Sequence, residues 1–233
     1  MSTIAQLAAE ILAAPAPVVF FDTCAILDVA RAPTRAQPDT VTAAEALVAL
    51  VGQTPPKVHL LVADIVATEW TDNIRSACDE LTRAVSVFEH LTQVIVATGI
   101  VTHPTVSPAL AGLSPDLEAR SLALLTACRA INRDVGAANA ALDRVVAKRR
   151  PSHKKEVKDS YILEHCLAVA RELGGATFQK RMLFVSSNTK DFADPGSTAV
   201  HTDLASDFAT AGLGYAGTIA IAVAQLRAAG QIP

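Results

Sequence analysis

The segment VVFFDTCAILD, residues 18–28, is the clearest indication of fold class in this chain. It opens with four consecutive apolar residues and no polar alternation, which is typical of a strand buried on both faces of a parallel sheet. Asp22 follows at once, and residues 23–30 have the composition of a helix. A buried strand that ends at an acid and passes directly into a helix predicts an α/β fold, with Asp22 at the carboxyl edge of the sheet.

Two further apolar runs, residues 58–62 and 182–185, are also predicted to be strands. A capping box at Thr3 and Gln6 predicts a first helix, which two prolines end, and Asp64 is a candidate N-cap for a long helix. Ser114 is a second candidate cap. Further helices are predicted at residues 40–51, 114–128, 139–148, 157–173 and 203–211, with a polar loop at 186–197 and a final apolar segment at 218–228. The middle of the chain is expected to be almost wholly helical, as an insertion at about 73–150 into a parallel sheet.

Composition excludes several classes of protein. The chain has 233 residues, of which 51% are hydrophobic and 18% charged, so it can bury a sizeable core. Its longest apolar runs, residues 46–51 and 219–224, are far shorter than the roughly 20 residues of a membrane-spanning helix. No Lys or Arg precedes Arg31, so we expect no signal peptide, and the scattered cysteines favour free thiols in a cytoplasmic chain.

The positions of four acids suggest a site that binds a metal ion. Asp22 ends one strand, Asp191 follows another, Glu69 lies in the helix after the second strand, and Asp159 lies in the first turn of a later helix. Carboxyl ends of parallel strands meet at one edge, so these side chains can be neighbours. Clustered carboxylates repel each other unless a divalent cation joins them, and hard oxygen ligands suit Mg²⁺ or Mn²⁺. Taken singly, each acid also fits an ordinary helix cap or surface residue.

Two segments of the first third resemble motifs of the PIN-domain nucleases. VVFFDTCAILD resembles the first motif of the family, and this match gives Asp22 as a metal ligand with Thr23 as a nearby hydroxyl. VADIVATEW, residues 62–70, is similar to the second motif, a helix whose glutamate follows apolar residues, and gives Glu69.

Two segments of the last third continue the resemblance in the same order. VKDSYILEHCLAVA, residues 157–170, is similar to the third motif and gives Asp159. LFVSSNTKDF, residues 183–192, is similar to the fourth and offers Ser186, Asn188 and Asp191. Many family members carry Asp where Asn188 stands, so either Asp191 is the fourth acid or three acids act with Asn188 assisting.

The resemblance implies a fold, an activity and partners. The fold is a three-layer α/β/α sandwich with a central parallel sheet, a single PIN-like domain over residues 1–233 with a helical insertion. The activity is hydrolysis of RNA, expected to be single-stranded, by an endoribonuclease that holds Mg²⁺ or Mn²⁺ on Asp22, Glu69, Asp159 and Asp191. Many family members are toxins of toxin–antitoxin pairs, so an antitoxin protein is a further implied partner. The apolar insertion and the habit of the family also imply a homodimer.

A basic segment leads directly into Asp159. Residues 148–158 hold six cations: Lys148, Arg149, Arg150, Lys154, Lys155 and Lys158. The net charge of the whole chain is −3, and the other 222 residues carry 14 basic and 22 acidic side chains, or −8. These cations can hold a nucleic-acid backbone through its phosphates, although a charge run is by default a solvated face.

Two other functions compete with the nuclease. A haloacid-dehalogenase-like phosphatase also begins with a strand and an aspartate, but it normally needs a second Asp where Cys24 stands. A PIN-like domain without catalysis, serving as an RNA- or partner-binding module, remains the main alternative.

Overall fold

The computed structural model describes residues 3–35, 37–99, 110, 112–152 and 157–233. Within these residues, five parallel strands form one sheet in the order β3-β2-β1-β4-β5. The strands are β1 (Val18–Phe21), β2 (His59–Ala63), β3 (Arg129–Ile131), β4 (Met182–Val185) and β5 (Leu213–Ala216). Every residue of β1 is buried, as its unbroken apolar sequence predicts for the central strand.

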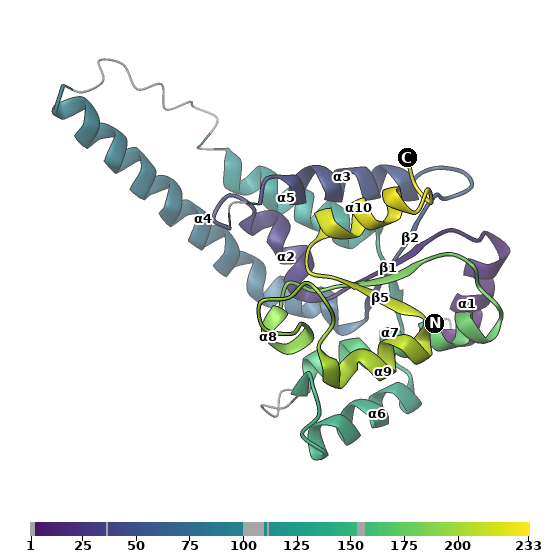
Figure 1. Ribbon diagram of the computed structural model, residues 1–233. Coiled ribbons are helices and arrows are strands. Elements are labelled where there is room, and N and C mark those ends of the chain that lie inside the picture. Colours follow the sequence, from purple (N-terminus) through teal and green to yellow (C-terminus); the bar gives the residue numbers. More distant parts are fainter. Residues whose placement is uncertain (1–2, 36, 100–109, 111, 153–156) are drawn as a thin grey trace.

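Helices cover both faces of this sheet (Figure 1). One layer contains α2 (Thr23–Arg31), α3 (Asp39–Val51), α4 (Ile65–Ala97), α5 (Leu113–Ala127) and α10 (Ile219–Ala228). The other contains α1 (Ile4–Ala13), α6 (Val135–Val146), α7 (Lys158–Gly175) and α9 (Thr202–Ala211), while the short α8 (Thr189–Phe192) follows β4. The fold is therefore the three-layer α/β/α sandwich that the sequence predicts.

The order of the strands reverses between β1 and β4, and we call the carboxyl edge of the sheet at this point the crevice. From β1 the chain passes to β2 and β3 on one side, then crosses to β4 and β5 on the other. The backbone N–H of Asp22 donates to the carbonyl of Val185 at 3.0 Å, so the residues that end β1 and β4 are joined. Ligands of open α/β sheets bind where the strand order reverses, and this point lies between β1 and β4.

The two edge strands are absent from the sequence prediction. The sequence predicts an almost wholly helical middle of the chain, and this is wrong for residues 129–131, which form β3 and pair with β2. Its sequence is Arg-Ala-Ile, of which only Ile131 is buried, and β5 contains Gly214, so neither strand has the long apolar run of a central strand. The predicted strand at 58–62 is confirmed with a shift of one residue, and those at 18–21 and 182–185 are confirmed.

Several helix boundaries also differ from the prediction. Asp64 makes no side-chain capping hydrogen bond, because its own backbone is already helical. Ser114 lies inside α5, and the polar loop at 186–197 contains α8. The predicted helix at 139–148 begins earlier, because the side chain of Asp134 accepts a hydrogen bond from the N–H of Ala137 and caps α6.

In the part of the chain that the structure describes, each helix is too short or too polar to cross a membrane. The cysteines at positions 24, 78, 128 and 166 are free, and Cys166 is fully buried.

Candidate active site at the carboxyl edge of the sheet

Asp22 lies at the centre of the crevice, as the N-cap of α2. Its Oδ1 accepts a hydrogen bond of 2.8 Å from the N–H of Thr23, and its Oδ2 accepts from the hydroxyl of Ser186 at 2.7 Å. The carboxyl group is 3% exposed. This burial raises the pKa of Asp22, the hydrogen bonds of Cys24 and Ser186 oppose the rise, and the charge of Glu69 adds to it.

Glu69 reaches the crevice from the second turn of α4. Its Oε2 accepts a hydrogen bond of 2.6 Å from Oγ1 of Thr23, and its Oε1 lies 3.2 Å from Nζ of Lys158. Thr23 therefore touches two of the predicted acids, Asp22 through its backbone N–H and Glu69 through its side chain.

Asn188 connects the remaining two acids. Its side-chain amide donates to Oδ2 of Asp159 at 3.0 Å and to Oδ2 of Asp191 at 2.8 Å. Its backbone N–H donates to Oγ of Ser186 at 3.2 Å, and that hydroxyl in turn donates to Asp22. One continuous set of hydrogen bonds thus links Asp159 and Asp191 with Asp22.

The cations of the basic segment make ion pairs within the chain. Arg149 lies 3.1 Å from Asp207, and Nη1 of Arg150 lies 3.9 Å from Oδ1 of Asp191. Lys158 pairs with Glu69 while 65% of its side chain stays exposed. Lys148 ends the turn after α6 with a positive φ, and Lys154 and Lys155 lie outside the described residues.

The chemistry of the donor set fits a hard divalent cation, because it consists of carboxylate, hydroxyl and amide oxygens. The side chains lie in two groups, Asp22 with Glu69 and Asp159 with Asp191, which Ser186 and Asn188 connect. Among the described residues, no three or more His, Cys, Asp or Glu side chains stand close enough to hold one metal ion.

Two contacts near the site involve residues that the sequence analysis does not predict to be part of it. Sγ of Cys24 donates to Oδ2 of Asp22 at 2.9 Å, and burial together with the charge of Asp22 raises the pKa of this thiol well above its usual value. Arg35 pairs with the buried Asp28 and donates to Oγ of Ser187 at 3.4 Å, which ties α2 to the loop after β4. Asp28 is the last residue of the first motif, but the sequence alone does not indicate that it pairs with Arg35.

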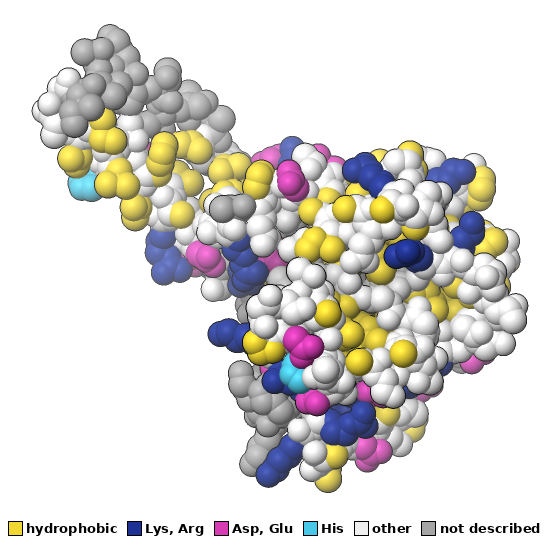
Figure 2. Space-filling view, viewed as in Figure 1, with side chains coloured by type: hydrophobic (Ala, Val, Ile, Leu, Met, Phe, Trp, Pro, Cys, Tyr) yellow, Lys and Arg dark blue, Asp and Glu magenta, His cyan; other side chains and the backbone are white. Residues whose placement is uncertain are grey.

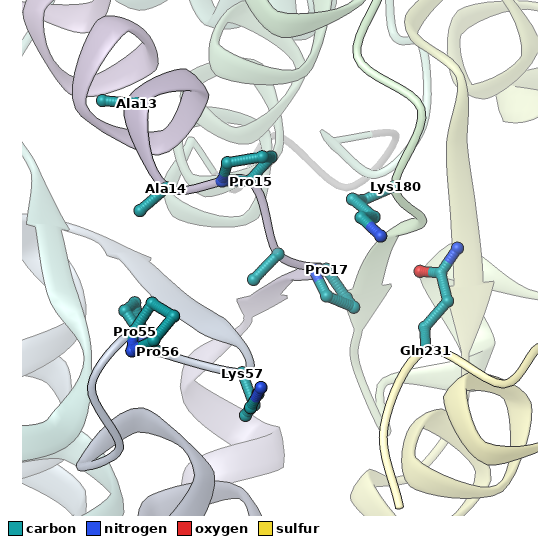
Figure 3. Close-up of a pocket in the computed structure, with 10 residues that line it drawn as sticks. Ala13, Ala14, Pro15, Pro17, Pro55, Pro56, Lys57, Lys180 and Gln231 are labelled. Carbon is teal, nitrogen blue, oxygen red and sulfur yellow. The ribbon is translucent and has the colours of Figure 1, made fainter.

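The opposite end of the sheet has a cavity of its own (Figure 3). Its volume is about 390 Å³, and Pro17, Lys57 and Lys180, which precede β1, β2 and β4, line it. Because these residues stand at the amino ends of the strands, the cavity is separate from the crevice that holds the acids.

Comparison with known proteins gives one family. No curated protein and no solved structure matches this chain. The family model described as PIN domain matches residues 19–192, well over half of the 233 residues, and this span includes all four acids. The chain therefore belongs to the PIN domain family, whose members are generally nucleases.

Proposed function

We propose that this protein is a metal-dependent endoribonuclease that hydrolyses RNA at the crevice between β1 and β4. The observation that carries the proposal is the hydrogen-bond network from Thr23 and Asp22 through Ser186 to Asn188, which connects acids from four separate segments. An edge of buried and partly buried carboxylates has an electrostatic cost that a divalent cation removes.

Asp22, Glu69, Asp159 and Asp191 would hold Mg²⁺ or Mn²⁺. When bound, the cation lowers the pKa of a water molecule and neutralises charge on the phosphodiester. Thr23 orients the carboxylate of Glu69, and Ser186 orients that of Asp22. Asn188 holds the carboxylates of Asp159 and Asp191 side by side, at the position where many members of the family carry an aspartate.

The basic segment supplies contacts to the RNA backbone in this proposal. Lys158 supports it most directly, because its ammonium lies next to Glu69 and most of its side chain faces solvent. Lys148, Arg149 and Arg150 precede it along the chain, and Lys154 and Lys155 complete the segment. Phosphate contacts of this kind bind RNA without reading its sequence, and they weaken as salt is raised.

Cleavage of labelled single-stranded RNA tests the proposal. We expect cleavage with Mn²⁺ or Mg²⁺ and none with a chelator, and we expect Asp22→Asn to lose roughly a hundredfold or more in rate. Asp39→Asn is the matched control, because Asp39 is exposed in the first turn of α3. Undiminished cleavage by Asp22→Asn would remove the metal mechanism.

A second readout does not depend on activity. A cation that binds only the folded protein raises its unfolding temperature. We expect Mn²⁺ to raise this temperature in the wild type and to raise it much less in Asp22→Asn.

An RNA- or partner-binding module without catalysis is the second candidate. It is favoured by the separation of the acids into two pairs, with no group of three within the described residues. RNA binding without cleavage at any Mn²⁺ concentration would select this function. The toxin role, with an antitoxin protein as partner, rests on the family alone, and growth arrest on expression is its test.

A further inference from the structure

The helix α4 extends well past the residues that pack on the other helices, which we call the body of the protein. It runs from Ile65 to Ala97, and its second half projects beyond the other helices (Figure 1). Its first half packs on α2 and α5, where the buried residues end at Leu81. None of the described residues from 82 to 97 of this helix is buried. Helices in proteins owe most of their stability to packing of an apolar face, and within the described part of the chain the projecting half has no such packing.

The projecting half nevertheless carries an apolar face. Side chains of Val87, Phe88 and Leu91 are 60%, 56% and 54% exposed, and those of Val94 and Ile95 are 47% and 42% exposed. Figure 2 shows hydrophobic side chains gathered along this arm. We call residues 84, 87, 88, 91, 94 and 95 the α4 stripe.

The stripe continues a heptad pattern that starts inside the body. Counting Phe88 as position a, the a positions hold Ile74, Leu81, Phe88 and Ile95, and the d positions hold Trp70, Ala77, Ala84 and Leu91. Residues of the first two heptads are buried against the body, and those of the last two are exposed. Apolar residues at a and d form the seam through which one helix packs along another.

The seam is complementary to itself when two copies run antiparallel. Because a residues face d residues across such a seam, Phe88 of one copy lies opposite Leu91 of the other, and Ala84 lies opposite Ile95. The large Ile95 thus meets the small Ala84, which allows the layers to interdigitate. Each of these contacts occurs twice, as a two-fold axis requires.

Charge also favours a second copy, and the area is compatible with one. Between residues 84 and 98 only Glu89 and His90 can carry charge, and they occupy the outward positions b and c. The seam therefore has no charged side chain that could bind a partner through ion pairs. The exposed stripe amounts to roughly 450 Å² per copy, so pairing buries on the order of 900 Å² before flanking side chains are added, a little below the roughly 1,000 Å² expected of a biological interface.

We propose that the α4 stripe is a dimerisation surface, through which two copies of this chain pair as antiparallel helices. The proposal is independent of the nuclease activity, because the seam is remote from Asp22 along α4. It predicts a particle of twice 24.3 kDa in solution.

Sedimentation or light scattering tests the oligomeric state. We expect the wild type to be a dimer and Leu91→Glu to be a monomer with an unchanged circular dichroism spectrum, because a carboxylate at position 91 would be buried against Phe88 of the other copy. Leu142→Glu is the matched control: Leu142 lies on α6, is 52% exposed, and should leave the dimer intact.

Disulfide cross-linking tests the register. Residues 84 and 95 are about 16 Å apart along one helix, so the double variant Ala84→Cys with Ile95→Cys can form its disulfides only between copies. Ala84→Cys with Gln93→Cys is the control, since Gln93 lies at the outward position f and should not cross-link.

Three results would overturn the proposal. The first is a wild type that is monomeric at every concentration, and the second is a dimer that survives Leu91→Glu. The third is a monomer that co-sediments with phosphatidylglycerol vesicles and loses this binding in Leu91→Glu, because the stripe would then serve a membrane surface.

Discussion

Thr23 and Glu69 meet across 46 positions of sequence, through a hydrogen bond of 2.6 Å from Oγ1 of Thr23 to Oε2 of Glu69. The backbone N–H of the same threonine donates to Asp22. One residue therefore sets the relative position of two acids, one from the end of β1 and one from α4.

The variant Thr23→Val removes the hydroxyl and keeps the shape. We expect RNA cleavage to fall about tenfold, which corresponds to about 1.4 kcal/mol. Thr71→Val on the exposed face of α4 is the control, because that hydroxyl bonds only to the carbonyl of Ala67 in its own helix. If Thr23 acts through Glu69, the loss in a double variant with Glu69→Gln is smaller than the product of the single losses. Independent losses would contradict this role.

The variant Asp22→Asn should be more stable than the wild type while being inactive. A buried carboxylate has a desolvation cost that an amide of the same shape avoids, and the raised pKa of Asp22 reflects that cost. In metal-free buffer we expect the midpoint of thermal unfolding to rise by about 2–4 °C, as about 1 kcal/mol does in a chain of this size. The control Asp39→Asn should leave it unchanged, and a lower midpoint in Asp22→Asn would contradict the argument.

The variant Asn188→Asp replaces the shared amide donor by a third carboxylate. It loses the hydrogen bonds to Asp159 and Asp191 and gains repulsion from both. We expect a lower unfolding midpoint without metal and a larger rise on addition of Mn²⁺ than in the wild type. Asn139→Asp, at an exposed position of α6, should change neither value. A rise with Mn²⁺ no larger than that of the wild type would show that position 188 is not beside the cation.

The variant Arg144→Met should destabilise the fold strongly. Arg144 is 2% exposed, pairs with the buried Glu164, lies 2.6 Å from Asp207 and donates to the carbonyl of Arg150. Removing one partner of a buried ion pair costs about 3–5 kcal/mol, because the other charge stays buried. Arg149→Met breaks an exposed pair with Asp207 and should cost less than about 1 kcal/mol. If urea denaturation gives the same loss of unfolding free energy for both variants, the buried pair of Arg144 is no more important than the exposed pair of Arg149.

The stability of the fold should fall as pH drops below about 6.5. Burial lowers the pKa of His59 from its model-peptide value of 6.5, while a contact of 2.8 Å between Nε2 and the carbonyl of Ala14 opposes the shift. The unfolded chain then binds a proton more readily than the folded one, so acid favours unfolding. We expect His59→Gln to show a weaker pH dependence between pH 6.5 and 5 in urea denaturation. A pH dependence as steep as that of the wild type would exclude His59 as the cause.

The sequence predicts the centre of this molecule better than its edges. The central strands β1 and β4 are apolar at every position and have no other stable place than the middle of a parallel sheet. The strands β3 and β5 contain Arg129 and Gly214 and lack an unbroken apolar run, so only their pairing with a neighbouring strand makes them strands.

For the candidate site too, one part is predictable from the sequence and another is not. The order of apolar runs and acids in the sequence is enough to predict that Asp22, Glu69 and Asp191 belong to the carboxyl edge, because parallel strands end together. The side-chain contacts, in contrast, are visible only in the folded chain: Thr23 bonds to Glu69, Asn188 lies between Asp159 and Asp191, and Arg150 and Lys158 pair with acids of their own chain. Those contacts join segments far apart in sequence, and their geometry depends on how α4, α7 and α8 pack on the sheet, which no local pattern encodes.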